Sequence, residues 1–210
     1  MTPPLQAALA TAAWCALHSA FVSHRWRRCV DRNLPSYRPW QRLVYVAAST
    51  ASLGLLVLWV RTLPETLLWD WTGVWRWIRW LGLVEAGLLF WLGARAYDGR
   101  GFLGLRQATD HLAGRSPRAP VLRTDGILGV IRHPWYVGTL VLLAFILPVT
   151  DVNLAWRLVL AGYVLVGTEL EERKLLADVG PAYAAYRQRV PRFLPRLVAR
   201  REPRRRRDRP

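Results

Sequence analysis

Long apolar stretches, separated by polar segments, constrain the fold of this 210-residue chain more than any other feature. Three of them, at about residues 4–22, 43–63 and 77–97, approach the ~20 residues that an α-helix needs to cross a bilayer. Two shorter ones lie at about 133–149 and 154–168, the second continuing as a polar helix. Backbone groups in lipid must bond internally, which favours helices. The sequence therefore predicts an all-α integral membrane protein with about five transmembrane helices.

The distribution of charge predicts the orientation of these helices. The chain carries 30 Lys and Arg against 14 Asp and Glu, a net charge of +16. The basic residues concentrate after the first stretch, after the third and in the C-terminal region. Because cytoplasmic segments carry the excess of Lys and Arg, we expect the N-terminus outside and the C-terminus in the cytoplasm, in a bacterial inner membrane. We expect contact with membrane lipid and none with nucleic acid, since a soluble nucleic-acid-binding protein has no use for such apolar stretches.

The chain divides into three regions. Residues 1–97 are expected to form a three-helix scaffold that lines the substrate site. Residues 98–195 are expected to bind a cofactor through a helical hairpin and a short amphipathic helix, and 196–210 to form a disordered basic tail in the cytoplasm. No metal-ligand spacing occurs, so no metal site is predicted. The ionisable Glu85 inside the third stretch is expected to pair with Arg157.

Polar side chains are predicted to converge at the cytoplasmic ends of the helices. His133 and Tyr136 open the fourth stretch, whereas Glu171 and Glu172 follow the fifth, so a helical hairpin returns the two groups to one depth. His18 lies near the cytoplasmic end of the first stretch. These residue types suit a ligand that is zwitterionic at one end and reacts at the other. Ordinary ion-pair networks also gather at such interfaces, and that alternative stays open at this point.

Four motifs follow one another in the C-terminal half: Arg132-His133-Pro134-x-Tyr136-x-Gly138, Glu171-Glu172-x-x-Leu175, Val179-Gly180-x-x-Tyr183-x-x-Tyr186 and Val190-Pro191-x-Phe193-x-Pro195. Their order and spacing resemble the isoprenylcysteine carboxyl methyltransferase-like superfamily of integral membrane enzymes, which use S-adenosylmethionine. The N-terminal half, through Leu17-His18-Ser19 and Gly104-Leu105-Arg106-Gln107, is more similar to a bacterial branch that includes methanethiol S-methyltransferases and NnrU-like proteins.

The resemblance implies roles for individual residues. The cofactor would contact Gly126, Arg132, His133, Pro134, Tyr136 and Gly138, and its ammonium would bind Glu171 or Glu172. The chemistry agrees, since a buried ammonium needs a carboxylate, a carboxylate needs a cation such as Arg132 or His133, and a sulfonium is attracted to an aromatic face. The expected catalytic residues are His18, His133 and Glu171. A thiol acceptor must lose its proton, and His18 or His133 has a suitable ordinary pKa.

The acceptor is the less constrained part of the prediction. Members that methylate a carboxylate usually carry an Arg shortly before the paired glutamates, where this chain has Glu169. A negative Glu169 would repel an anion, which favours a small or lipid-soluble acceptor such as a thiol over an isoprenylcysteine-like carboxylate. Three alternatives remain: a phospholipid N-methyltransferase, an NADPH-dependent sterol-type reductase and a non-catalytic NnrU-like protein. The reductases usually have Asn and Glu where this chain has Trp135 and Thr139.

Overall fold

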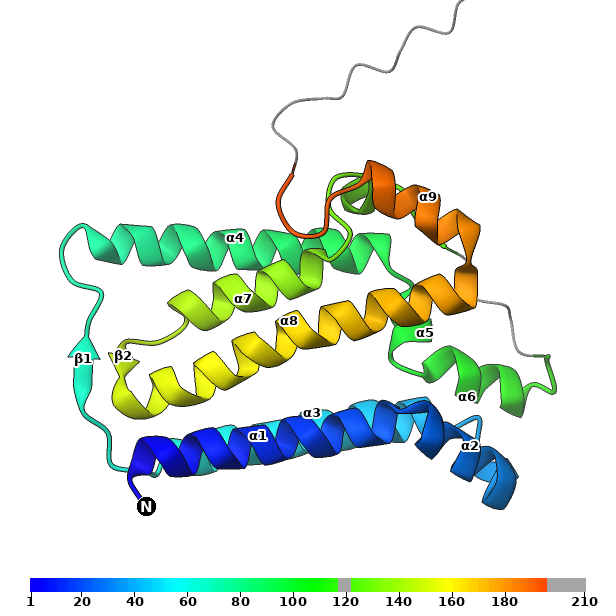
Figure 1. The fold of residues 1–210 in the computed structure, drawn as a ribbon, viewed down its shortest axis with the longest axis horizontal. Coiled ribbons are helices and arrows are strands. Elements are labelled where there is room, and N and C mark those ends of the chain that lie inside the picture. The colour runs from blue at the N-terminus through cyan, green and yellow to red at the C-terminus, as the bar shows by residue number, and fades with distance from the viewer. Residues whose placement is uncertain (117–121, 196–210) are drawn as a thin grey trace, which may run out of the picture.

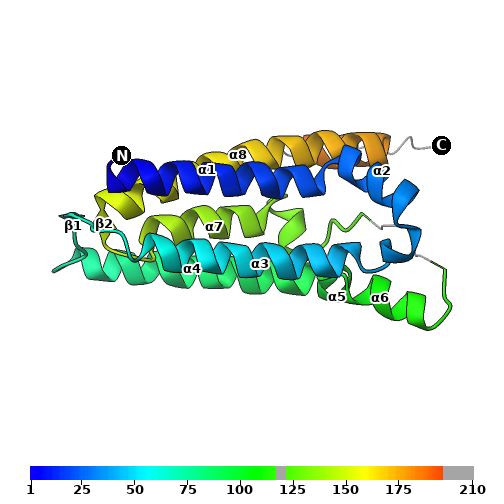
Figure 2. The same ribbon diagram turned by 90° about the horizontal axis from the view of Figure 1, so that it is seen from below.

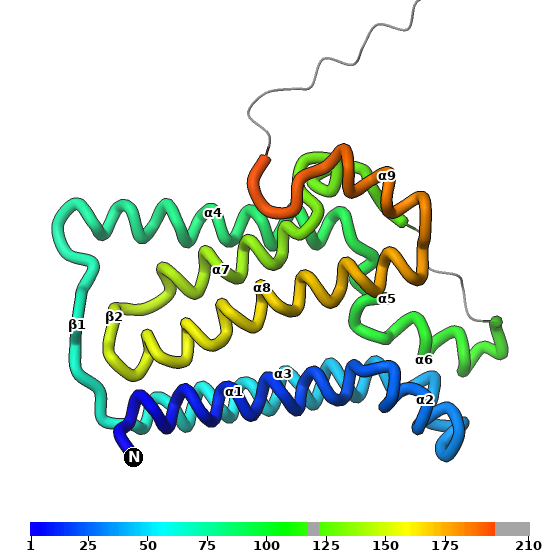
Figure 3. The backbone as a smooth tube through the Cα atoms, in the orientation of Figure 1, coloured from blue at the N-terminus to red at the C-terminus, as the bar shows by residue number. Residues whose placement is uncertain are grey.

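A computed structural model describes residues 1–116 and 122–195, which form a bundle of helices (Figure 1). The main helices are α1 (Pro3–Val22), α3 (Gln41–Val60), α4 (Trp75–Ala96), α7 (Pro134–Phe145) and α8 (Asp151–Val179). Each runs in the direction opposite to the one before it, as the tube in Figure 3 shows. The predicted tail, 196–210, lies outside the described residues.

Short elements close the two ends of the bundle. One end carries α2 (His24–Asn33), η1 (Pro35–Tyr37), α5 (Gly99–Phe102), α6 (Leu105–Leu112), η2 (Gly126–Gly129) and α9 (Pro181–Arg189). The other end carries the N-terminus and an antiparallel pair, β1 (Leu67–Trp69) with β2 (Val149–Thr150). The sequence predicted α9 correctly, but it did not predict the short helices within 98–132 or the strand pair.

The helices pack in two pairs. Helix α1 packs along α8 and α4 packs along α7, and Figure 2 shows α7 between the layer of α1 and α8 and the layer of α3 and α4. Glycines bring α4 and α7 close together. A Cβ on Gly82 would come within 2.3 Å of the Phe145 ring, and one on Gly93 within 2.3 Å of the Trp135 ring. Small residues at such contacts are typical of membrane helices.

Three helices are long and apolar enough to cross a membrane: α1 and α3 with 20 residues each and α4 with 22. Helix α7 is apolar but has 12 residues, a length of about 18 Å against a hydrocarbon core of ~30 Å. The predicted helical membrane architecture is therefore confirmed, whereas the count of about five spans stays a prediction.

Two arginines satisfy the backbone where α7 ends. Arg79 donates to the carbonyls of Phe145 and Ile146 at 2.9 and 2.7 Å. Arg157, which is only 5% exposed, donates to the carbonyls of Leu143 and other residues of this turn. Free carbonyls in lipid are costly, so these guanidiniums explain how a helix can stop here. The predicted pairing of Arg157 with Glu85 is wrong, because Arg157 donates its hydrogen bonds to backbone carbonyls and Glu85 lies exposed on α4.

Candidate active site

The hairpin of α7 and α8 brings the predicted residues together. The Tyr136 hydroxyl donates to Glu171 Oε2 at 2.5 Å, and His133 Nε2 lies 3.2 Å from Glu172 Oε1. The rings of His133 and Tyr136 stack, with centroids 5.3 Å apart and an interplanar angle of 16°. The convergence predicted from the hairpin is therefore confirmed.

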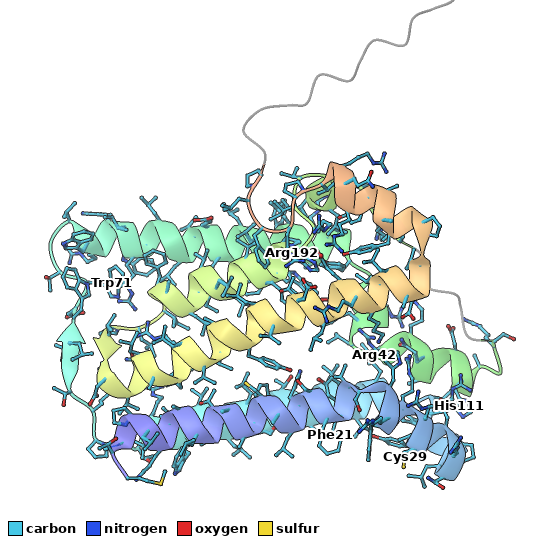
Figure 4. All side chains as sticks on the ribbon, viewed as in Figure 1. Phe21, Cys29, Arg42, Trp71, His111 and Arg192 are labelled. Carbon is cyan, nitrogen blue, oxygen red and sulfur yellow. The ribbon has the colours of Figure 1, made fainter. Side chains whose placement is uncertain are left out.

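Glu172 is the centre of a buried ion-pair network. Its residue is 0% exposed, and it accepts hydrogen bonds from Arg132 Nε at 2.9 Å and from Arg192 Nη2 at 2.7 Å. Burial favours the neutral acid, but the hydrogen bonds from Arg192 and Arg132 outweigh it and lower the pKa of Glu172 to about 2. The carboxylate is therefore ionised and fully engaged inside the protein. Figure 4 shows Arg192 where the segment after α9 returns to α7 and α8.

Arg132 is engaged as completely as Glu172. It is 7% exposed, and its guanidinium also donates to the carbonyls of Arg187 and Val190. Its backbone N–H donates to the Pro191 carbonyl at 3.0 Å. These bonds tie the start of α7 to the chain that leaves α9. They give a structural reason for the spacing between the Arg-His-Pro and Val-Pro motifs.

Glu171 is the carboxylate that stays accessible. Its side chain is 43% exposed, and its bonds within the described part of the chain are the one from Tyr136 and a 4.0 Å contact with His133 Nδ1. Burial lowers the pKa of His133 even though both glutamates act to raise it, so the imidazole is neutral at neutral pH. Arg132 and His133 are both already bonded to Glu172, and their predicted contacts with a cofactor stay predictions.

Arg42 was not predicted as a site residue. It was counted only among the basic residues that indicate the orientation in the membrane. Arg42 lies in the first turn of α3. Its Nε donates to the Phe102 carbonyl at 2.7 Å, which holds the side chain against α5. Figure 4 shows Arg42 at the end of the bundle that carries α5 and α6. The sequence feature that could have identified Arg42 is its position one turn before Tyr45 on the same helix.

His18 lies in a separate aromatic cluster made by α1, α3 and α8. Its Nε2 is 2.6 Å from the Tyr45 hydroxyl, and its ring lies 4.8 Å from that of Trp14 and 5.9 Å from that of Tyr163. Its Nδ1 is buried and has no hydrogen-bond partner within residues 1–116 and 122–195. Ser19, the next residue of α1, bonds the Tyr163 hydroxyl at 3.0 Å.

One face of α8 connects this cluster to Glu171. Tyr163, Gly167 and Glu171 are spaced four residues apart, which places them on one side of the helix. The two ends of the row are separated by about 12 Å along the axis. A Cβ added to Gly167 would meet no atom within 4 Å. Open space therefore adjoins Gly167, midway along the row between Tyr163 and Glu171.

The remaining predicted residues have structural positions. Gly126 starts η2 with a φ of 58°, a conformation that suits glycine, and Pro134 is buried at the first position of α7. A Cβ on Gly138 would come 3.3 Å from α4, so Gly138 has a packing role. Their contacts with a cofactor stay predictions.

The environment of Glu169 corrects one expectation. Its carboxylate accepts from Arg173 at 3.1 Å and from Arg192 at 2.8 Å. These two guanidiniums compensate its charge, so Glu169 does not act as the free negative charge that was expected to repel an anionic acceptor.

Comparisons with known proteins place the chain among methyltransferases. It is 32% identical over 188 residues to methanethiol S-methyltransferase 2 of Bradyrhizobium diazoefficiens, a match covering 88% of this chain and 70% of that protein. It is 30% identical over 191 residues to a Pseudomonas methanethiol S-methyltransferase (87% and 70%), and 29% identical over 186 residues to that of Mycobacterium tuberculosis (85% and 72%). The chain belongs to the methanethiol S-methyltransferase family. No family model and no solved structure matches it.

This membership confirms the predicted recognition and enzyme class. Membership of a methyltransferase family favours this enzyme class over the predicted alternatives of a reductase and a non-catalytic protein. The relatives bear out the predicted resemblance to the branch with methanethiol S-methyltransferases, and they match most of the chain rather than its N-terminal half alone.

Proposed function

We propose that this protein is a membrane methyltransferase that moves a methyl group from S-adenosylmethionine to a small thiol, with methanethiol as the acceptor. The relatives carry that activity in their names. The observations that support it here are the accessible Glu171 carboxylate, the open position beside Gly167 and the unpartnered Nδ1 of His18. When bound, the cofactor supplies a methyl group on a positively charged sulfur.

The residues present fit the cofactor's amino-acid end. Glu171 offers a half-exposed carboxylate for an ammonium, and Arg42 supplies the guanidinium for a carboxylate. The face of Tyr136, which Glu171 and the stacked His133 hold in place, suits a sulfonium. Glu172 and Arg132 lie behind Glu171, Tyr136 and His133, and their ion pair fixes the position of these groups. Of the two glutamates expected to bind the ammonium, this assignment selects Glu171 rather than Glu172.

The acceptor end lies deeper, among the apolar walls of α1, α3 and α8. A thiol is a poor nucleophile until it loses its proton. His18 is the group there with an unoccupied nitrogen that can take that proton. His133 is engaged with Glu172 and Tyr136, which makes it a positioning residue in this proposal.

The proposed membrane arrangement has α1, α3, α4, α7 and α8 crossing in turn, with the N-terminus outside a bacterial inner membrane and the C-terminus in the cytoplasm. The alternating direction of these helices supports it. The site then opens at the cytoplasmic face, where the basic segments lie. Single cysteines placed at either end and labelled with an impermeant maleimide in whole cells test this orientation. Labelling of the α9 end from outside would refute it.

Activity is tested with protein purified in detergent. Calorimetry measures the binding of S-adenosylmethionine, and gas chromatography of the headspace measures dimethyl sulfide formed from methanethiol. We expect Glu171→Gln to lose cofactor binding, while Asp178→Asn, an exposed carboxylate on the same helix, keeps it. Absence of cofactor binding and product in the unaltered protein would refute the proposed function, and binding of NADPH in its place would favour a reductase.

A further inference from the structure

Aromatic side chains from three helices surround the imidazole of His18. Its ring neighbours are Trp14 from α1, Tyr45 from α3 and Tyr163 from α8. Of its two nitrogens, Nε2 faces the Tyr45 hydroxyl at 2.6 Å, and Nδ1 is buried without a partner in the described part of the chain. A buried ring nitrogen without a partner is costly, which marks it as the place where a ligand completes the bonding.

The contact with Tyr45 is made in full when Nε2 carries the proton of the neutral ring. Nε2–H then donates to the Tyr45 hydroxyl oxygen at 2.6 Å. A neutral imidazole protonated at Nε2 has a free lone pair on Nδ1. This tautomer leaves Nδ1 as the proton acceptor.

Building on the proposed function, we infer that Tyr45 is a positioning residue for the methyl transfer and that His18 Nδ1, Tyr163 and Trp14 form the subsite for a small apolar thiol. The S–H proton of the thiol passes to Nδ1, and the electron pair left on sulfur forms the new S–CH₃ bond. The bond between the methyl group and the donor sulfonium breaks, and its electron pair stays on the donor sulfur, which becomes a neutral thioether.

The charge of the subsite supports this step. A positive sulfonium is consumed as a positive imidazolium forms, so the pocket carries the same net charge before and after transfer. The neighbouring rings, two phenols and an indole, are neutral but attract a cation to their faces. The proton then leaves His18 for water as the apolar product departs.

The test compares two acceptors. Methanethiol must be deprotonated, whereas thioacetate is similarly small and already carries an ionised sulfur at neutral pH. We expect His18→Gln to lower turnover of methanethiol about 100-fold, with thioacetate turnover changed by less than about threefold. Tyr45→Phe, which keeps the ring and removes the hydroxyl, should lower methanethiol turnover by about 10-fold with the same rescue. Both variants should keep their affinity for S-adenosylmethionine.

Tyr163→Phe is the matched control, because it removes a phenol from the same pocket without touching His18 Nε2. It should affect both acceptors equally. Equal losses with both acceptors in His18→Gln and Tyr45→Phe would overturn the inference and leave those residues with packing roles. If the unaltered protein methylates neither acceptor, the proposed function itself fails, so the two failures are distinguishable.

Discussion

The open space beside Gly167 leads to a prediction in which stability and activity change in opposite directions. Glycine inside a helix is less favourable than alanine by roughly 0.5–1 kcal/mol. Gly167 lies in the interior of α8, and its added Cβ would meet nothing within 4 Å. Gly167→Ala should therefore stabilise the protein by about that amount, which corresponds to a rise in Tm of roughly 2–4 °C per kcal/mol for a chain of this size.

The Cβ methyl group that Gly167→Ala adds enters the space that we assign to the cofactor and the thiol. A displacement of about 1 Å at a reacting centre can cost on the order of 100-fold in rate. We expect Gly167→Ala to reduce turnover about 10-fold, and Gly167→Leu, whose side chain fills the space, to lose cofactor binding and at least 100-fold in turnover. Melting in detergent, calorimetric titration and headspace chromatography measure the three quantities.

Gly162 provides a matched control on the same helix. It is exposed, and its Cβ position is also open. Gly162→Ala should gain the same helix stability with turnover unchanged. The reasoning would be refuted if Gly167→Leu bound S-adenosylmethionine and methylated methanethiol like the unaltered protein, because the open face of α8 would then not be the ligand site.

Other predictions concern the scaffold. Glu172→Gln leaves the buried Arg132 without its charge partner and should cost about 3–5 kcal/mol of folding stability, seen as a lower Tm. Because the folded pKa of Glu172 is lowered from 4.5 to about 2, its contribution is present above pH 4.5 and is lost as the pH falls toward 2, so melting followed over that range should show a decline that Glu172→Gln lacks. Tyr186→Phe removes the 2.6 Å bond to the Leu128 carbonyl and should cost about 1–3 kcal/mol of stability by leaving that carbonyl unsatisfied. Arg79→Leu should lower Tm because the last carbonyls of α7 lose a donor, whereas cofactor affinity, measured by calorimetry, should not change.

The amino-acid sequence by itself determined the helices and their meeting point. The bounds predicted for the first three apolar stretches and for 181–189 agree with α1, α3, α4 and α9 to within a few residues. These features depend on local hydropathy, proline and glycine signals, which a sequence contains directly. The convergence of His133 and Tyr136 with the paired glutamates was equally predictable, because a hairpin of two helices returns its ends to the same depth.

Only the tertiary structure decided what each side chain does there. Glu171 and Glu172 are adjacent, yet they point about 100° apart around α8. One therefore enters the buried arginine network and the other stays accessible. The approach of Tyr45 to His18 and the space beside Gly167 depend on how α1, α3 and α8 pack. Contacts between residues far apart in the chain follow from packing, which local patterns do not encode, and they select the working residues from the candidates that the sequence supplies.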